Sequence, residues 1–206
     1  MRSETRPLVG LRQRKKAKTR TAIQHEALRL FRLQGYGATT VDQIVDAVDV
    51  SPSTFFRYFP SKEALVLADD YDPLIMEAVR AQPADLGTIQ ALRSALRSVF
   101  GRVSQEELAD MSQRAQLALS VPELRAAVLD QFAQSIWQLS DLIAERAGRA
   151  IDDFAVRTLA GAILGVIIAA EFRWAEHPES NLFSLLDEAL GNLESGLRVS
   201  WEAVLG

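Results

Sequence analysis

Between residues 40 and 65, apolar residues recur among polar ones at helical spacing, and this pattern predicts two short helices joined by a turn. Four apolar residues at helical spacing form one stripe of the first helix: Val41, Ile44, Val45 and Val48. Thr40 opens this helix, because a Thr followed three positions later by Gln43 has the pattern of a capping box. We expect the stripe to pack inward, and Asp49 and Val50 to make the turn.

The second helix has a defined start and end. Ser51 is suited to cap its first turn, and Pro52 fits the first helical position, where the missing N–H is not needed. Pro60 disfavours helical geometry in the residue before it, so the helix is expected to end near Phe59. Ser61 then caps a further helix.

Two helices of this length bury too little surface to be stable, so a third must brace them. Residues 19–34 supply it, with Gly35 as a C-terminal cap and one apolar face: Ile23, Ala27, Leu30 and Phe31. Phe55 and Phe59 are four residues apart and are expected to point into this core. The outward and flanking positions are then Ser53, Thr54, Phe56 and Arg57. The pattern therefore predicts a helix-turn-helix over residues 40–59 that can meet DNA.

The rest of the chain also reads as helices, which predicts an all-α fold. The expected ranges are 88–102, 104–119, 121–146, 153–176 and 181–204. Upstream of them, Asp72 and Pro73 have the pattern of an N-cap and a first helical position. We expect the helix that follows Ser61 to break there and to form a hinge between two domains.

The helix predicted over residues 153–176 is apolar on nearly every side. Gly161, Gly165 and Ala169 recur in it at four-residue spacing, which permits close helix approach. One small domain offers too few neighbours to cover such a helix, so we expect a symmetric homodimer through the last two helices. The uncharged run 158–170 is too short for a bilayer, so no membrane span is expected.

Positive charge is concentrated at the N-terminal end. Residues 1–67 carry 12 Lys and Arg against 6 Asp and Glu, whereas residues 68–206 carry 11 against 21. The net charge of −4 therefore does not argue against nucleic acid. Most of the excess lies within residues 1–20, which we interpret as a flexible arm that adds phosphate affinity or enters a minor groove. The alternative is a solubilising leader with an earlier start of the first helix.

Several functional classes find no support. The absence of cysteine excludes disulfides and thiolate metal sites and fits a reducing cytoplasm. His25 and His177 each lack a second histidine nearby, and there is no glycine-rich phosphate loop or protease or hydrolase motif. Asp69, Asp70 and Asp72 are better explained by capping and solvation than by a metal. We therefore expect no enzyme activity, cofactor or metal.

The segments GYGATTVDQIVDAVDVS, TFFRYF and SKEAL resemble the amino-terminal domain of the TetR family of bacterial transcriptional regulators. The resemblance implies DNA contacts from Thr40, Pro52, Ser53, Thr54, Phe56, Tyr58 and Lys62, and it makes Arg57, at a position that varies in such families, a candidate for a base contact. Phe56 and Tyr58 have a core position as their alternative. Lys62, in a first helical turn, favours a nearby phosphate, and its alternative is a solvated side chain beside Glu63. The implied domains are a basic flexible arm (1–18), a DNA-binding domain (19–79) and a ligand-binding and dimerisation domain (80–206).

In this family the middle helices enclose an effector pocket. The resemblance makes these residues candidates for its lining: Leu96, Val99, Phe100, Met111, Arg114, Ala115, Phe132, Ile136, Trp137 and Phe172, with Trp174 as an alternative to Phe172. Each apolar candidate has simple core packing as its alternative. The segment from Arg114 through SVPELRAAVLDQF is similar to TetR-like regulators that sense acyl-CoA-like molecules, which favours a hydrophobic or amphipathic effector.

The sequence thus predicts a cytoplasmic, homodimeric repressor that binds a palindromic double-stranded DNA operator and is released by a small-molecule effector. A co-repressed regulator, an activator and an architectural protein that binds DNA without preference are the alternatives. An enzyme or carrier built on the C-terminal bundle is a further alternative, for which no acid, base, nucleophile or metal constellation is found.

Overall fold

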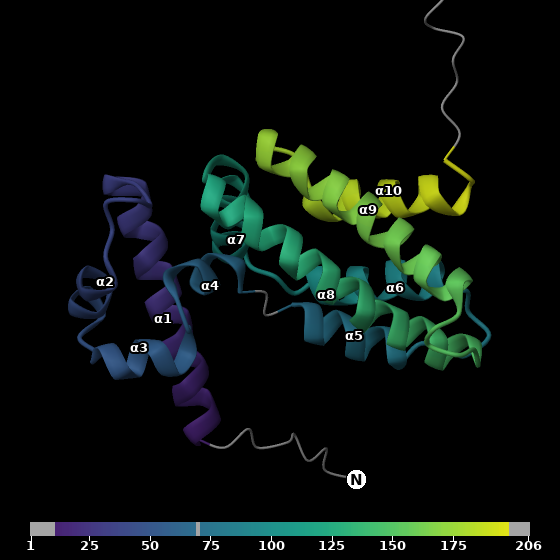
Figure 1. Ribbon diagram of the computed structural model, residues 1–206, viewed down its shortest axis with the longest axis horizontal. Coiled ribbons are helices and arrows are strands. Elements are labelled where there is room, and N and C mark those ends of the chain that lie inside the picture. Colours follow the sequence, from purple (N-terminus) through teal and green to yellow (C-terminus); the bar gives the residue numbers. More distant parts are fainter. Residues whose placement is uncertain (1–10, 69–70, 198–206) are drawn as a thin grey trace, which may run out of the picture. The chain divides into compact units, whose positions relative to one another are not determined.

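The computed structural model describes residues 11–68 and 71–197, and its regular elements there are ten α-helices (Figure 1). The all-α prediction is confirmed. The chain divides into two compact units, one through Val66 and one from Leu67. Four helices belong to the first part of the chain: α1 (Leu11–Gln34), α2 (Val41–Val48), α3 (Pro52–Tyr58) and α4 (Lys62–Leu67).

The helix boundaries of the first unit follow from caps that the sequence predicted. Thr40 and Gln43 form both hydrogen bonds of the capping box. The Ser51 hydroxyl accepts the N–H of Thr54, and Pro52 begins α3. Gly35 takes a left-handed φ of 86° after α1, a conformation that costs glycine little. These local interactions place α2 and α3 at the predicted positions.

The first unit is held together by a small hydrophobic core. Its most deeply buried apolar residues are Ile23, Ala27, Leu28, Phe31, Ile44, Val45, Phe55, Phe59, Leu65 and Val66. The Gln24 amide nitrogen donates a 3.0 Å hydrogen bond to the Leu65 carbonyl, which ties α4 to α1. The predicted inward faces are confirmed for most of their residues, whereas Leu30, Val41 and Val48 are only half-buried, and α4 adds a fourth face.

The start of α1 corrects the predicted arm. Helix α1 begins at Leu11, so residues 11–18 are helical and not a flexible arm. Lys, Arg, Gln and Ala are strong helix formers, and they extend a helix that is already nucleated by its packed half, without needing an apolar stripe. Residues 1–10 of the predicted arm lie outside the described residues.

The second unit contains the remaining six helices. They are α5 (Asp72–Arg80), α6 (Thr88–Phe100), α7 (Gln105–Ser120), α8 (Pro122–Ala147), α9 (Phe154–Glu176) and α10 (Leu182–Glu194). Helix α9 packs against α7, α8 and α10, and α6 packs against α5 and α10 (Figure 1). The buried core between them includes Leu92, Leu96, Leu142, Ile143, Ile163, Trp174 and Leu190.

The helix that follows Ser61 breaks as predicted, but the residues at the break occupy other capping positions than the sequence predicted. Helix α4 ends at Leu67 and α5 begins at Asp72. Asp72 is the first helical residue rather than the cap, and the capping position belongs to Tyr71, which makes no side-chain capping bond. Pro73 thus stands at the second helical position, where its missing N–H is still not required.

The last helix is shorter than predicted. Helix α10 ends at Glu194, because Gly196 and Leu197 adopt left-handed φ values of 93° and 50°. The N–H of Leu197 donates to the Asn192 carbonyl and that of Gly196 to the Leu193 carbonyl, which is a Schellman cap. The range 181–204 was therefore wrong at its end, and residues 198–206, including Trp201, lie outside the described part.

Helix α9 has an apolar surface that the described residues cover only in part. Its most apolar window has a mean hydropathy of 1.8, with 22% of that window buried, so by length and composition alone the helix could cross a membrane. The uncharged run 158–170 is only part of this helix, which is 23 residues long.

Candidate nucleic-acid interface and effector cavity

Helix α3 presents two neighbouring phenylalanines in opposite directions. Phe55 is fully buried, with its ring centroid 5.9 Å from that of Phe59. The side chain of Phe56 is 52% exposed and meets Phe55 edge-on, at 5.3 Å between centroids. One face of α3 therefore anchors the helix and the other displays an aromatic ring to solvent.

The predicted DNA-contacting residues lie around this exposed face. Thr40, Pro52, Ser53, Phe56 and Arg57 are exposed, and Thr54 and Tyr58 are half-buried. The Ser51 hydroxyl lies 2.9 Å from that of Ser53 and 3.0 Å from that of Thr54, so the first turn carries a linked row of hydroxyls. The Arg57 guanidinium lies 5.3 Å from the Tyr58 ring centroid. Hydroxyls, an arginine and an exposed ring are groups that contact phosphates and base edges.

Lys62 donates hydrogen bonds to backbone carbonyl groups, a role that neither interpretation of the sequence predicted. Its Nζ donates to the carbonyl oxygens of Tyr36 (2.8 Å) and Thr39 (2.9 Å), and lies 4.1 Å from the Tyr36 ring centroid. The ammonium group thus holds the loop that leads to Thr40, at the start of α2. The sequence carried no signal for this, because both acceptors are backbone atoms of a loop that lies two helices earlier in the chain.

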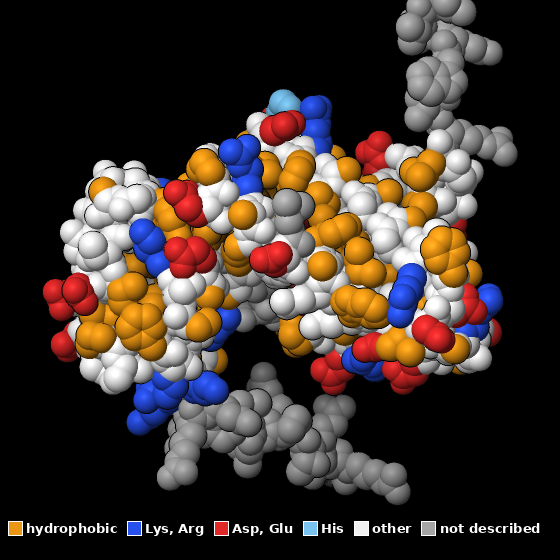
Figure 2. Space-filling model, in the orientation of Figure 1, with side chains coloured by type: hydrophobic (Ala, Val, Ile, Leu, Met, Phe, Trp, Pro, Cys, Tyr) orange, Lys and Arg blue, Asp and Glu red, His pale blue; other side chains and the backbone are white. Residues whose placement is uncertain are grey.

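A further cation lies against the recognition helix, and others line the start of α1. The Arg20 guanidinium is 4.9 Å from the ring centroid of Phe59, which caps α3. Lys15, Lys16 and Lys18 are exposed. Lys and Arg side chains gather at this end of the first unit (Figure 2). The positive charge of the first unit is therefore available at its surface, where phosphates can approach.

The second unit contains an apolar cavity of about 100 Å³. All six helices from α5 to α10 contribute to its lining. Most lining side chains are apolar, such as Ile75, Met76, Leu92, Leu164 and Leu186. An apolar lining with a few polar groups is typical of sites for small hydrophobic molecules.

The structure brings together only part of the predicted effector residues. Leu96, Phe100 and Met111 line the cavity. Val99 instead lines a second, more open cavity beside α5. The other candidates line neither of these two cavities: Arg114, Ala115, Phe132, Ile136, Trp137 and Phe172. The spacing of apolar residues indicates which face of a helix points inward. It does not indicate whether that face lines a cavity or packs closely in the core.

Three of the predicted effector residues that line neither cavity make other contacts or lie at other positions in the second unit. The side chain of Trp137 is 51% exposed, and the Arg157 guanidinium lies 4.4 Å from its ring centroid. Phe172 is also exposed, while the alternative Trp174 is buried in the core. Arg114 donates to the carbonyl of Ala68, the first residue of the break between α4 and α5.

Sequence reasoning missed the contribution of α5 and α10. Ile75 and Met76 of α5 and Leu182 and Leu186 of α10 line the cavity. The sequence pattern predicts a hinge at the start of α5 and a dimer contact for α10, and neither role places these side chains at an effector. Among the described residues, no three His, Cys, Asp or Glu side chains are placed to hold a metal ion, and Asp69 and Asp70 lie outside that part.

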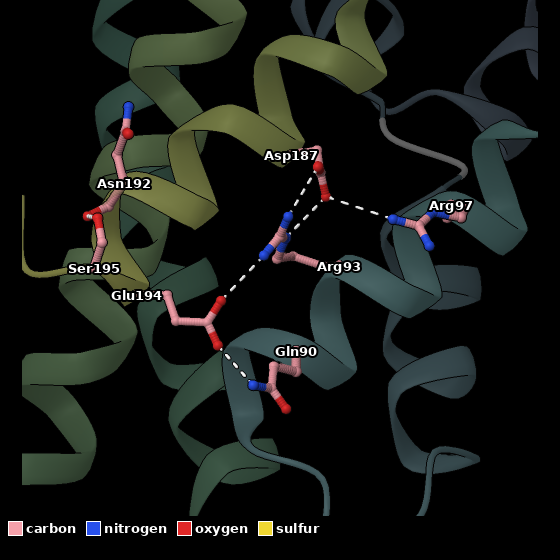
Figure 3. A network of polar contacts seen from close by, with 7 residues as sticks. All are labelled: Gln90, Arg93, Arg97, Asp187, Asn192, Glu194 and Ser195. Carbon is pink, nitrogen blue, oxygen red and sulfur yellow. Dashed lines mark hydrogen bonds and ion pairs between the residues drawn. The ribbon is translucent and has the colours of Figure 1, made fainter.

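An ion-pair network joins α6 to α10 beside the cavity (Figure 3). Arg93 donates two hydrogen bonds to Asp187, from Nε to Oδ1 (2.8 Å) and from Nη2 to Oδ2 (2.9 Å). Its Nη1 also donates to Glu194 (3.1 Å), which accepts a bond from Gln90. The hydrogen bonds from Arg93 lower the pKa of the Asp187 carboxyl, and the same pairing raises the pKa of Arg93. The network fixes the separation of two helices that both line the cavity.

This network predicts a pH-dependent contribution to stability. Because the pKa of Asp187 is depressed in the folded state, its contribution is complete above the unfolded pKa of 3.8 and is lost as the pH falls through the folded pKa. We expect Arg93→Met to lower the free energy of unfolding near neutral pH by about 1 kcal/mol, since the pair is partly exposed. Below the folded pKa of Asp187, wild type and Arg93→Met should have the same free energy of unfolding, as measured by urea unfolding.

Arg97→Met is the matched control, because Arg97 lies 4.0 Å from Asp187 and is mostly exposed. A constant difference between wild type and Arg93→Met at all pH values would contradict the assignment.

Comparisons with known proteins agree with this architecture. A model described as bacterial regulatory proteins of the tetR family matches residues 23–68, and one described as the MftR C-terminal domain matches residues 86–198. The transcriptional regulator TcmR of Streptomyces glaucescens is 35% identical over 203 residues, which cover 93% of this chain and 90% of TcmR. The putative mycofactocin biosynthesis regulator MftR of Mycobacterium tuberculosis is 27% identical, with 89% and 93% covered.

Solved structures show the same fold. A TetR-family regulator from Syntrophomonas wolfei has a TM-score of 0.62 at 20% identity, covering 89% of this chain and 98% of that one. The repressor FadR of Thermus thermophilus, in complex with lauroyl-CoA, has a TM-score of 0.52 at 26% identity, with 88% and 96% covered. With both halves matched and TcmR similar along nearly the whole chain, the protein belongs to the TetR family of DNA-binding transcriptional regulators, a family without enzymatic activity.

Proposed function

We propose that the protein is a homodimeric repressor that leaves a palindromic operator when a small hydrophobic or amphipathic effector fills the α5–α10 cavity. The observation that carries the proposal is the pairing of an exposed recognition helix in one unit with an apolar cavity in the other. We assign DNA reading to the first unit, and effector binding and dimerisation to the second.

The proposed DNA contacts come from the exposed side of α3 and the start of α2. Phe56 and Arg57 reach base edges or sugars, and the hydroxyls of Ser53 and Thr54 reach phosphates. Thr40, Pro52 and Tyr58 flank them and position the helix on the backbone. Lys62 acts indirectly in this proposal, because its ammonium group is held by two carbonyls of the loop before α2.

The proposed dimer covers the open side of α9. Six residues share its outer stripe: Phe154, Thr158, Gly161, Gly165, Ala169 and Phe172. A Cβ at Gly161 or Gly165 would meet no atom within 4 Å among the described residues outside its own stretch of helix, so packing among those residues explains neither glycine. Close approach of a second α9 would use both, and membership of a family of DNA-binding regulators favours a protein partner over lipid. Two recognition helices would then meet half-sites about 34–36 Å apart.

Effector binding is proposed to act through the break between α4 and α5. Helix α5 lines the cavity and follows the break directly, and Arg114 of α7 holds the carbonyl of Ala68 within it. A ligand that shifts α5 would therefore change the path of the chain towards α4 and the DNA-binding unit. An acyl-CoA-like effector is one candidate, since the related FadR structure contains lauroyl-CoA. The cytoplasm is the proposed location, where both DNA and such effectors are present.

The DNA proposal is tested by fluorescence anisotropy on DNA from upstream of the protein's own reading frame, against random DNA across a salt series. We expect tight binding that survives unlabelled random competitor. Lys62→Met is expected to weaken binding by about tenfold through the loop before α2, without changing the salt dependence. Equal affinity for both DNAs would instead indicate an architectural binder. Strengthening of operator binding by the effector would indicate a co-repressed regulator or an activator.

The dimer proposal is tested by sedimentation of Gly165→Leu. We expect a monomer of unchanged helix content, because the new side chain meets open space within the chain but obstructs a second α9. Ala155→Leu, at an exposed position of α9 outside the stripe, is the control and should remain a dimer. A wild-type monomer at micromolar concentration, or a dimer that survives Gly165→Leu, would contradict the proposed interface.

A further inference from the structure

The cavity lined by helices α5 to α10, here called the inner cavity, is small for the effector that we proposed above. It measures about 100 Å³, whereas pockets that hold drug-sized ligands measure about 300–1,000 Å³. A ligand of that size needs space beyond the inner cavity. The second cavity beside α5, here called the outer cavity, measures about 320 Å³ and offers that space.

The outer cavity has both apolar and charged lining residues. Its apolar lining residues are Leu74, Ala78, Ala81, Val99 and Val103. The side chain of Leu74 is 50% exposed, which is a large exposure for an apolar residue in a cavity wall. The charged lining residues have both signs, with Glu77 and Glu107 against Arg102. The outer cavity therefore suits the polar end of a ligand together with part of its apolar body.

Tyr71 is a wall of both cavities. Its ring is stacked on that of Phe100, which lines the inner cavity, with 6.0 Å between centroids and 20° between planes. Hydrogen bonds from Ser104 and a further one from Tyr71 lower the pKa of Glu107, which lines the outer cavity. Tyr71 thus separates the two cavities from the start of α5, in contact with α6 and α7.

We propose that the two cavities form one effector site that Tyr71 divides in this structure, and that its ligand is an elongated amphipathic molecule. The ligand places its apolar end in the inner cavity and its polar end in the outer cavity, and its entry turns the Tyr71 ring away from Phe100. Tyr71 occupies the capping position of α5 without a side-chain capping bond, so its ring can turn without removing a cap. The inference rests on the effector site proposed above and adds the shape of the ligand and the side chain that it displaces.

The experiment uses N-phenyl-1-naphthylamine, a neutral two-ring fluorescent probe that is too large for the inner cavity alone. Its affinity for the full-length protein is measured by fluorescence titration. Ala81→Trp fills part of the outer cavity and should weaken binding by at least about tenfold, because each carbon-sized group that loses its burial lowers affinity about fourfold. Ala84→Trp is the matched control, since Ala84 is also exposed in the segment after α5 but lines neither cavity.

Tyr71→Ala tests the division between the cavities. Stopped-flow association of the probe should be about two- to tenfold faster in this variant, because no stacked pair of rings has to separate before the probe enters. Helix content and operator binding are measured for every variant, and both should match those of the wild type.

The outcomes distinguish this inference from the proposed function. Unchanged probe affinity in Ala81→Trp, with association no faster in Tyr71→Ala, would overturn the joined site and leave an effector site in the inner cavity. Equal weakening by Ala81→Trp and Ala84→Trp would also overturn it, because the effect would not depend on the outer cavity. If neither this probe nor dodecanol, tested by calorimetry, binds to a wild type that binds its operator normally, the amphipathic effector and the joined site both fail.

Discussion

Replacing Phe55 with Ala is expected to lower the free energy of unfolding of the first unit by about 3–5 kcal/mol. Phe55 is fully buried, and its ring packs against Phe59 in a core that contains few large side chains. Helix α3 is only seven residues long, so it depends on this anchor for its position. The loss is measured by urea unfolding, and it should abolish operator binding because the recognition helix is no longer held.

The adjacent Phe56 gives the matched experiment. Its side chain is half exposed and contacts Phe55 only edge-on, so Phe56→Ala should cost less than about 1.5 kcal/mol of stability. Operator affinity should nevertheless fall about ten- to a hundredfold, since an apolar base or sugar contact is removed from the reading face. Unchanged operator affinity in a folded Phe56→Ala protein would remove this residue from the proposed interface. A stable Phe55→Ala protein would show that α3 is held by other contacts.

Replacing Arg146 with Met is expected to destabilise the second unit by about 2–4 kcal/mol. Its guanidinium donates to four carbonyls at the end of α5 and in the segment between α5 and α6: those of Val79 (3.0 Å), Gln82 (3.3 Å), Pro83 (2.8 Å) and Leu86 (3.0 Å). Methionine keeps the apolar stem but provides no donor, so these acceptors lose a charge-assisted partner. The segment joins two helices that line the cavity, so effector binding should weaken as well.

Arg149 provides the control for this prediction. It follows Arg146 closely in the chain and pairs with Asp153 at 2.7 Å on the surface, so Arg149→Met should leave the urea midpoint nearly unchanged. Equal effects of the two substitutions on the urea midpoint would mean that positive charge near the end of α8 determines stability, rather than the hydrogen bonds from Arg146 to the carbonyls.

Local signals account for what could be predicted of the fold. Capping by Thr40 and Ser51, the start at Pro52 and the end of α3 before Pro60 act within a few residues, so the sequence alone located the helix-turn-helix. The burial of Phe55 and Phe59 followed from helical spacing in the same way. Where a second local signal competed, the prediction failed: Gly196 ended α10 in a Schellman cap although the apolar stripe continued to Trp201.

By itself, then, the sequence determined the helical class, the recognition helix and the family resemblance, because caps, prolines and helical spacing act between near neighbours. Only the tertiary structure decided the partners of Lys62, the pairing of Arg93 on α6 with Asp187 on α10, and the cavity formed by six helices. These features depend on how helices far apart in the chain approach one another. A stripe of apolar residues specifies which side of a helix turns inward, but the neighbouring helices determine whether that side meets packed core, an opening for a ligand, or the partner of an arginine.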